Sequence, residues 1–135
     1  MSLLTFFAGL SAPSSLLPNP RNIYVGSING AGCTRNFQPK RPVEVEVFTV
    51  DFVNMLASGE IILSAAWTNT VSIGTDPAPG AMIQGAPTMS GSQVRQMIGG
   101  GVAGVFYAPI CTITTSGGQT LVLPESGAGL LAVKA

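Results

Sequence analysis

Short apolar runs separated by turn residues are the feature that most limits what this chain can fold into. From Pro42 onward such runs recur about every ten residues, and no stretch shows the 3.6-residue period of an amphipathic helix. Only residues 51–56 suit a single helical turn, with Asp51 as its N-cap. Several short strands between turn signals are typical of a sandwich. We therefore predict an all-β, antiparallel β-sandwich, because no crossover helices are available to connect parallel strands.

The predicted strands follow from residue type and alternation. Val43, Val45 and Val47 alternate with Glu44 and Glu46, which predicts a strand whose solvent-exposed face carries both glutamates. Trp67 is the only tryptophan, and we expect it to anchor the core from a central strand rather than to stack on a sugar. The other predicted strands cover residues 22–25, 60–70, 71–73, 81–83, 86–89, 93–98, 102–113, 119–123 and 130–133.

Residues 1–37 differ in composition from the rest of the chain. Pro13, Pro18 and Pro20 prevent a regular helix, so we expect an extended N-terminal arm. The arm begins with an apolar run too short to cross a bilayer, which needs roughly 20 residues, and no basic residue precedes it as in a signal peptide. The run must pack on the domain or on a neighbour, and we assign it to an interface: Leu3, Leu4, Phe6, Phe7 and Leu10. The predicted organisation is an arm (1–37), a sandwich (38–124) and a C-terminal tail or last strand (125–135).

Charged side chains are scarce. They make up 9% of the chain, against about 25% in an average protein, and six basic and six acidic residues cancel. So few and scattered basic residues argue against binding to nucleic acid. A neutral surface does little to keep copies apart in solution, which favours a protein whose surface is covered by other subunits. A merely sticky protein is the alternative.

The residue types for catalysis and metal binding are also scarce. The absence of histidine removes histidine-based triads and metal sites, and the six acids are too few and too scattered for calcium. The pair Glu44 and Glu46 is better explained by an exposed strand face than by glycoside hydrolysis. The glycine-rich residues 99–104 lack a Walker lysine and predict a turn. We expect no enzyme activity, no cofactor and no metal. Cys33 and Cys111 are expected to be small buried residues, and whether they pair is left open.

The stretch DFVNMLASGEIILSAAW, residues 51–67, carries the spaced pattern D-[WF]-x-x-x-L-x-x-G-[DE]-x-I-x-x-x-x-W. This pattern resembles that of the fiber-tail adaptor family of small tailed-bacteriophage virion proteins. The resemblance continues through Gly99-Gly100, Tyr107 and the threonine-rich hairpin at 114–120, and it covers about residues 37–123. Met55 departs from the family, which often has an aromatic residue there.

The resemblance implies an Ig-like β-sandwich and a non-enzymatic structural protein of the virion. Such a protein would join tail or connector to fibers in many copies, with other virion proteins and copies of itself as partners, and with neither nucleic acid nor membrane. We expect it in the tail or head-tail region, assembled in the host cytoplasm. A capsid decoration or cement protein is the alternative, and a carbohydrate-binding module is a more distant one. Copy number, symmetry, the proteins touched and tail or capsid location stay open.

Overall fold

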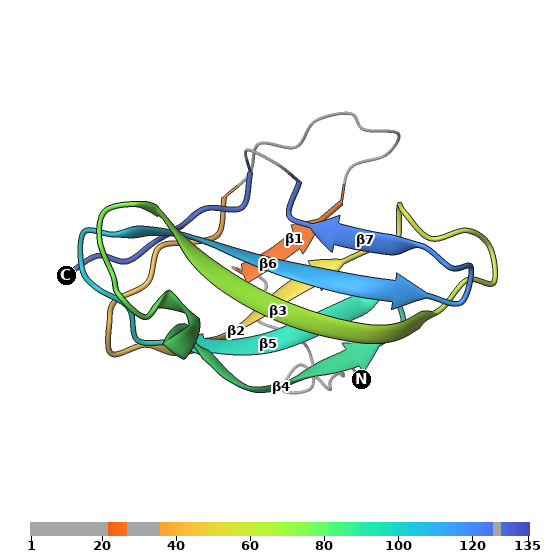
Figure 1. Ribbon diagram of the computed structural model, residues 1–135, viewed down its shortest axis with the longest axis horizontal. Helices are drawn as coiled ribbons and strands as arrows, with labels where there is room; N and C mark the ends of the chain where they lie inside the picture. The colour runs from red at the N-terminus through yellow and green to blue at the C-terminus, as the bar shows by residue number, and fades with distance from the viewer. Residues whose placement is uncertain (1–21, 27–35, 126–127) are drawn as a thin grey trace, which may run out of the picture.

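The computed structural model describes residues 22–26, 36–125 and 128–135, and within them the protein is an all-β sandwich of two packed sheets (Figure 1). The first sheet has the order β1-β2-β5-β4, and the second has the order β3-β6-β7 with β8 also paired to β6. The strands are β1 (Ile23–Val25), β2 (Val45–Asp51), β3 (Ile62–Ile73), β4 (Ile83–Ser90), β5 (Gln93–Gly99), β6 (Phe106–Thr115), β7 (Thr120–Leu123) and β8 (Leu131–Ala132). A 3-10 turn, η3 (Pro79–Met82), precedes β4.

The core lies between the inner faces of the two sheets. Alternate residues of β2, β5 and β6 point into it, and their side chains are fully buried. Burial of apolar surface of this kind contributes about 25 cal/mol per Å². The fully buried apolar members from these strands are Phe48, Val50, Val94, Ile98, Tyr107, Cys111 and Ile113.

The prediction of purely antiparallel pairing is wrong for β1, and an isolated bridge between Lys40 and Val133 is parallel as well. β1 pairs with β2 in parallel, with Ile23 opposite Thr49 and Val25 opposite Asp51. The chain between β1 and β2 is long enough for a parallel connection, which needs a dozen or more residues. The short strand expected at 22–25 is otherwise confirmed.

Several predicted strand boundaries are also wrong. Residues 71–73 are the end of the twelve-residue β3. Of the two weak candidates, 86–89 lies within β4, whereas 81–83 is mostly wrong because residues 81–82 belong to η3 and only Ile83 belongs to β4. The pairing of β4 with β5 shifts between Gln84 and Thr88. The expected start of β6 at residue 102 is too early, because residues 100–105 form the glycine-rich turn after β5. These strand ends differ from the predicted ones because turn residues within or beside apolar runs set where each strand begins and ends.

The predicted exposed face of β2 is reversed. Val43 is 86% exposed and Val45 46% exposed, whereas Glu44 and Glu46 are half-buried. Glu46 lies on the face of β2 that buries Phe48 and Val50, so the alternation was identified correctly but was assigned to the wrong side. The reason is a buried cation, Lys40, which lies close to both carboxylates.

The helical turn expected at residues 51–56 is present as an isolated turn. The N–H groups of Met55 and Leu56 both donate to the carbonyl of Phe52, at 2.8 and 3.2 Å. Asp51 is the last residue of β2, and its Oδ1 accepts a bond from the N–H of Val53 at 2.9 Å. It caps the turn as expected, although no helix follows.

Candidate interaction surfaces

Asp51 joins two loops at one end of the sandwich. Besides capping the turn after β2, its Oδ1 accepts a 2.6 Å bond from Ser92 Oγ, in the turn between β4 and β5. The neighbouring Phe52 is fully buried, and its N–H donates to the carbonyl of Ser92 at 2.8 Å. These contacts fix the β2–β3 loop against the β4–β5 turn.

Glu60 joins the same loop to the hairpin between β6 and β7. Its carboxylate accepts hydrogen bonds from the N–H of Ala57, at 2.8 Å, and from the hydroxyl of Thr115. These bonds favour the ionised form and lower the pKa of Glu60. A Cβ on Gly117 would lie 2.5 Å from Glu60 Oε2, which explains the glycine at the hairpin tip. Asp51 and Glu60 therefore hold three turns together.

Trp67 lies on the inner face of β3 and is 7% exposed, within the buried core cluster. A tryptophan in this position has no face free for stacking on a sugar ring. Its energetic role as the anchor of the core stays a prediction.

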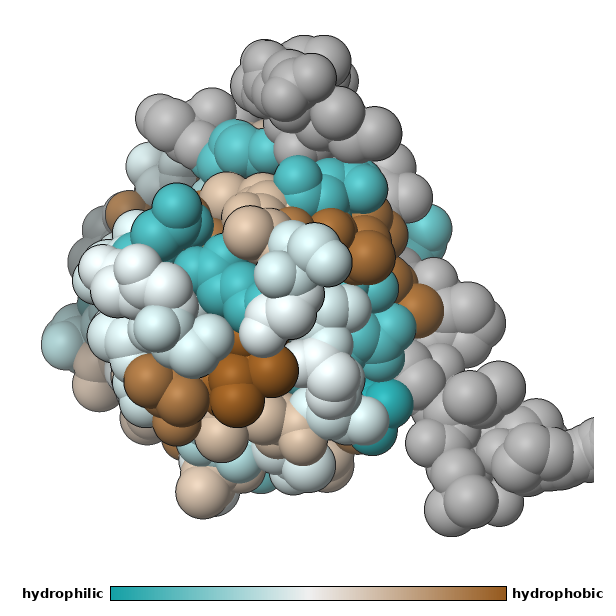
Figure 2. Space-filling view, turned by 90° about the vertical axis from the view of Figure 1, so that its right-hand side faces the viewer, coloured by the Kyte–Doolittle hydropathy of each residue, from teal (hydrophilic) through white to brown (hydrophobic). Residues whose placement is uncertain are grey.

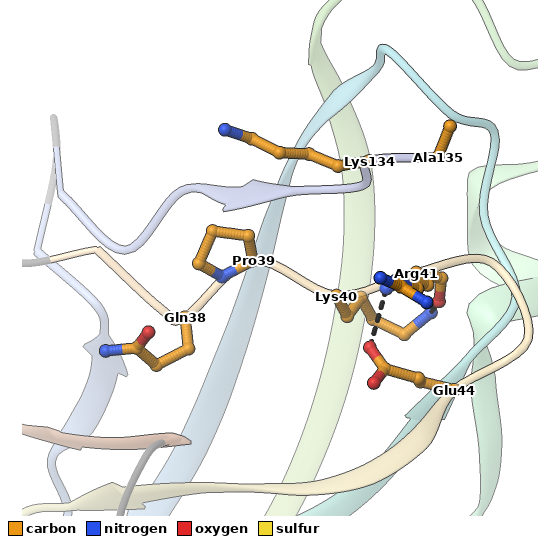
Figure 3. A pocket seen from close by; sticks show the side chains of 7 residues that line it. All are labelled: Gln38, Pro39, Lys40, Arg41, Glu44, Lys134 and Ala135. Atoms are coloured by element: carbon orange, nitrogen blue, oxygen red, sulfur yellow. Dashed lines mark hydrogen bonds between the residues drawn. The ribbon is translucent and has the colours of Figure 1, made fainter.

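The buried lysine lies beside a surface hollow of about 490 Å³, lined by Gln38, Pro39, Lys40, Arg41, Glu44, Lys134 and Ala135 (Figure 3). Lys40 Nζ donates to the carbonyls of Arg41, at 2.7 Å, and of Gly100, at 2.6 Å. Burial lowers the pKa of Lys40, while the nearby Glu44 and Glu46 oppose this shift. Lys134 points away from the other side chains (Figure 3). The ammonium is used to hold the chain after β5, so the hollow has a structural explanation.

The glycine-rich residues 99–104 also have a structural explanation, as the sequence predicts. The hydroxyl of Tyr107 accepts a 2.9 Å bond from the N–H of Val102 and donates a 2.7 Å bond to Asp76 Oδ2. Desolvation and the Asp76 carboxylate raise the pKa of Tyr107, and the pKa of Asp76 is lowered by its bonds to the Ala78 N–H and to Tyr107. The loop is tied to the β3–η3 connection and is not arranged for a phosphate.

Exposed apolar side chains gather at the end of the sandwich that Asp51 and Glu60 organise. Val53 is 54% exposed, Ile61 58% and Leu63 57%, and Met89 from the end of β4 is 46% exposed. Figure 2 looks onto this end and shows apolar patches among polar ones. Sequence reasoning missed these residues, although a signal was present. Val53, Ile61 and Leu63 occupy unspecified positions of the pattern at 51–67, whereas its specified positions are structural.

The interface residues predicted in the arm, Leu3, Leu4, Phe6, Phe7 and Leu10, lie outside the described residues, as does Cys33. Cys111 is buried with a free thiol, and burial raises its pKa to about 12. In the part of the chain that is described, no three acidic or sulfur side chains converge on a site for a metal ion. No helix there has the length and hydropathy to cross a bilayer.

The decisive comparison is with known families. The model of the family described as "Podophage GP4 fiber-tail adaptor protein gp77" matches residues 40–123, most of the sandwich. The chain belongs to this fiber-tail adaptor family. No curated protein matches it.

Membership confirms the resemblance seen in the sequence and makes the protein a structural component of a phage tail, in a family that is not a known enzyme class. A fiber-tail adaptor interacts with other tail and fiber proteins of the virion, so its functional sites are surfaces.

Proposed function

We propose that this adaptor joins the tail or connector to the fibers as a multi-copy Ig-like sandwich, held in place by its apolar N-terminal arm. Copies of itself and other virion proteins are the partners, neither nucleic acid nor membrane takes part, and assembly occurs in the host cytoplasm. The arm contributes Leu3, Leu4, Phe6, Phe7 and Leu10, and residues 125–135 form a C-terminal tail or last strand, within which β8 pairs with β6.

The observation that carries this proposal is the set of exposed apolar side chains beside a rigid scaffold. Val53, Ile61 and Leu63 are each more than half exposed, next to turns fixed by Asp51 and Glu60. Exposed apolar patches on a rigid framework mark sites of protein contact. The low charge supports the same conclusion, since ions are costly to bury at an interface.

The arm is tested by incorporation into particles. We expect the double variant Phe6→Asp/Phe7→Asp to fold normally yet to be lost from purified virions, because two carboxylates would have to be desolvated at the contact. The matched control is Ser11→Asp/Ser14→Asp, which adds the same charge outside the apolar run. Wild-type incorporation of the Phe6→Asp/Phe7→Asp variant would refute the role of the arm.

Labelling the protein in intact particles tests its location. Copies gathered around the tail support the adaptor, whereas copies spread over the capsid would indicate a decoration or cement protein.

The carbohydrate-binding alternative is tested with Trp67→Ala. We expect a loss of about 3–5 kcal/mol of stability, as for other large buried aromatic residues. A stable variant that had lost binding to host glycans would instead favour the carbohydrate-binding module.

A further inference from the structure

β3 forms one edge of the second sheet. Among the described residues β3 pairs with β6 alone, so its other edge is open. From Asn69 onward η3 covers this edge, because Asn69 Nδ2 donates to the carbonyl of Pro79 at 2.9 Å. Leu63 lies at a pairing irregularity. This leaves Ser64 to Thr68 as a regular stretch with no hydrogen-bonded neighbour on that side among the described residues.

This stretch has none of the usual protection of an edge strand. Natural edges carry charges, prolines or bulges that prevent pairing with another chain. The whole of β3 contains no charged residue and no proline, and its two register shifts lie outside Ser64 to Thr68. The edge strand of the other sheet, β4, is protected by Pro87 and by its shifted pairing, and β1 is only three residues long. Among the described strands β3 is the long edge suited to accept a further strand.

The first sheet, which packs against β3, indicates where a further strand would lie. Met89 pairs with Val94, which is fully buried, so the Met89 side chain is on the inner face of β4. Yet it is 46% exposed, and Ala65, on the inner face of β3, is half-buried. The second sheet is three strands wide, since β7 and β8 follow one another along the same side of β6, whereas the first sheet has four. A strand added beside β3 would cover these two side chains.

We propose that residues 3–7 of a second copy add to the edge of β3 at Ser64 to Thr68, which rests on the proposed role of the arm in assembly. Leu3-Leu4-Thr5-Phe6-Phe7 is uncharged, contains no proline and matches the length of the open stretch. Both faces of such a strand carry apolar side chains. The side chains of one face would cover Met89 on the inner side of the sandwich, and those of the other face would pack beside Ala66 and Thr68 on the outer side.

The position of the arm favours a second copy as the acceptor. The arm leaves the sandwich at Asn22, next to β1, which forms the edge of the first sheet opposite to β4 and therefore away from the open edge of β3. Extended chain from Phe6 to Asn22 spans up to roughly 50 Å, enough to reach a neighbour. Donor and acceptor on opposite edges let each copy give one arm and receive another, which is a head-to-tail contact that can close into a ring.

Photo-crosslinking between isotopically distinct copies tests this directly. Full-length protein carrying Phe6→p-benzoylphenylalanine is mixed with an equal amount of unmodified ¹⁵N-labelled protein and irradiated. We expect cross-linked peptides that join position 6 to residues 64–68 of the labelled copy. Links only within the same copy, or links to another edge or face, would overturn the proposal.

A matched pair of variants on the acceptor tests the edge itself. Ala66 and Thr112 are paired neighbours on the outer face, on the edge strand and on the middle strand respectively. Ala66→Lys would place a charge beside the incoming strand, so we expect the yield of this cross-link to fall by roughly threefold or more, with little change for Thr112→Lys. Equal yields in the two variants would contradict strand addition at this edge.

These outcomes separate the inference from the proposed function. If Phe6→Asp/Phe7→Asp prevents incorporation but the cross-links map away from β3, the arm still holds the protein in the particle and only the acceptor site is wrong. If this variant is incorporated normally, the role of the arm itself is refuted.

Discussion

Glu60 is a single carboxylate on which the packing of two turns depends. Its pKa is lowered in the folded protein, so its contribution to stability is complete above the unfolded-state value near 4.5 and is lost as the pH falls toward the folded-state value. Glu60→Gln removes this contribution. We expect the variant to be less stable than the wild type at neutral pH and to lose less stability on acidification. Urea unfolding at neutral and acidic pH measures both effects.

The difference between the two proteins is the informative quantity, because Asp76 also has a lowered pKa and remains in both. Stability curves that run parallel from neutral to acidic pH would show that Glu60 is not bound as described.

The pKa of Cys111 is shifted in the opposite direction, because burial disfavours the charged thiolate. Its side chain is fully buried and its pKa is raised to about 12, so little thiolate forms at neutral pH. In a Cys33→Ser variant, where Cys111 is the only thiol, we expect almost no reaction with a thiol reagent at pH ~8 until the protein is unfolded. Rapid labelling of the native variant would indicate that β6 opens locally.

At the scale of the element, β4 depends on a buried glutamine. Gln96 is 2% exposed, and its Nε2 donates to the carbonyls of Gln84, Gly85 and Met97, at 2.9 to 3.1 Å. It thereby satisfies the backbone where the pairing of β4 with β5 shifts. We expect Gln96→Leu to cost about 1–3 kcal/mol in urea unfolding, because it leaves buried carbonyls without a donor.

The neighbouring Met97 provides a control on the same strand. Its side chain is 41% exposed on the outer face, so Met97→Leu should leave stability almost unchanged. An equal effect of both substitutions would show that the bonds of Gln96 do not support β4.

Much of the strand pattern could be predicted from the sequence, because alternation and turn residues are local signals. The location of β5 and the hairpin after β6 follow from them directly. The face of β2 could not be assigned, because it depends on Lys40, which approaches Glu44 and Glu46 only in the folded chain. The parallel pairing of β1 could not be predicted from local patterns either, since it depends on contact between segments about 25 residues apart.

The candidate surfaces were predicted only in part. The pattern at 51–67 identified the family, yet its specified residues, such as Asp51 and Glu60, form the scaffold. The exposed Val53 and Ile61 lie at unspecified positions between these specified residues. Their apolar character was the one sequence signal that they belong to a contact surface. The packing of the neighbouring turns determines whether such a residue is exposed, and the sequence alone does not show this packing.

At the scale of the whole molecule, the scarcity of charge determines how assembly responds to salt. Six basic and six acidic residues leave no net charge, and the proposed contacts involve uncharged segments. We expect self-association of the full chain to weaken by less than about twofold between roughly 50 and 500 mM salt, because there is little electrostatic attraction to screen. Analytical ultracentrifugation measures this. Strong dissociation at high salt would indicate a charged interface instead.

The parallel pairing of β1 with β2 also has a mechanical consequence. Tension applied through the residues before Asn22, along the axis of β1, loads the hydrogen bonds between these two strands in shear. Bonds under shear share the load and must break together, whereas bonds at a peeled edge break one after another. The attachment point of the arm is therefore suited to resist pulling forces on a virion.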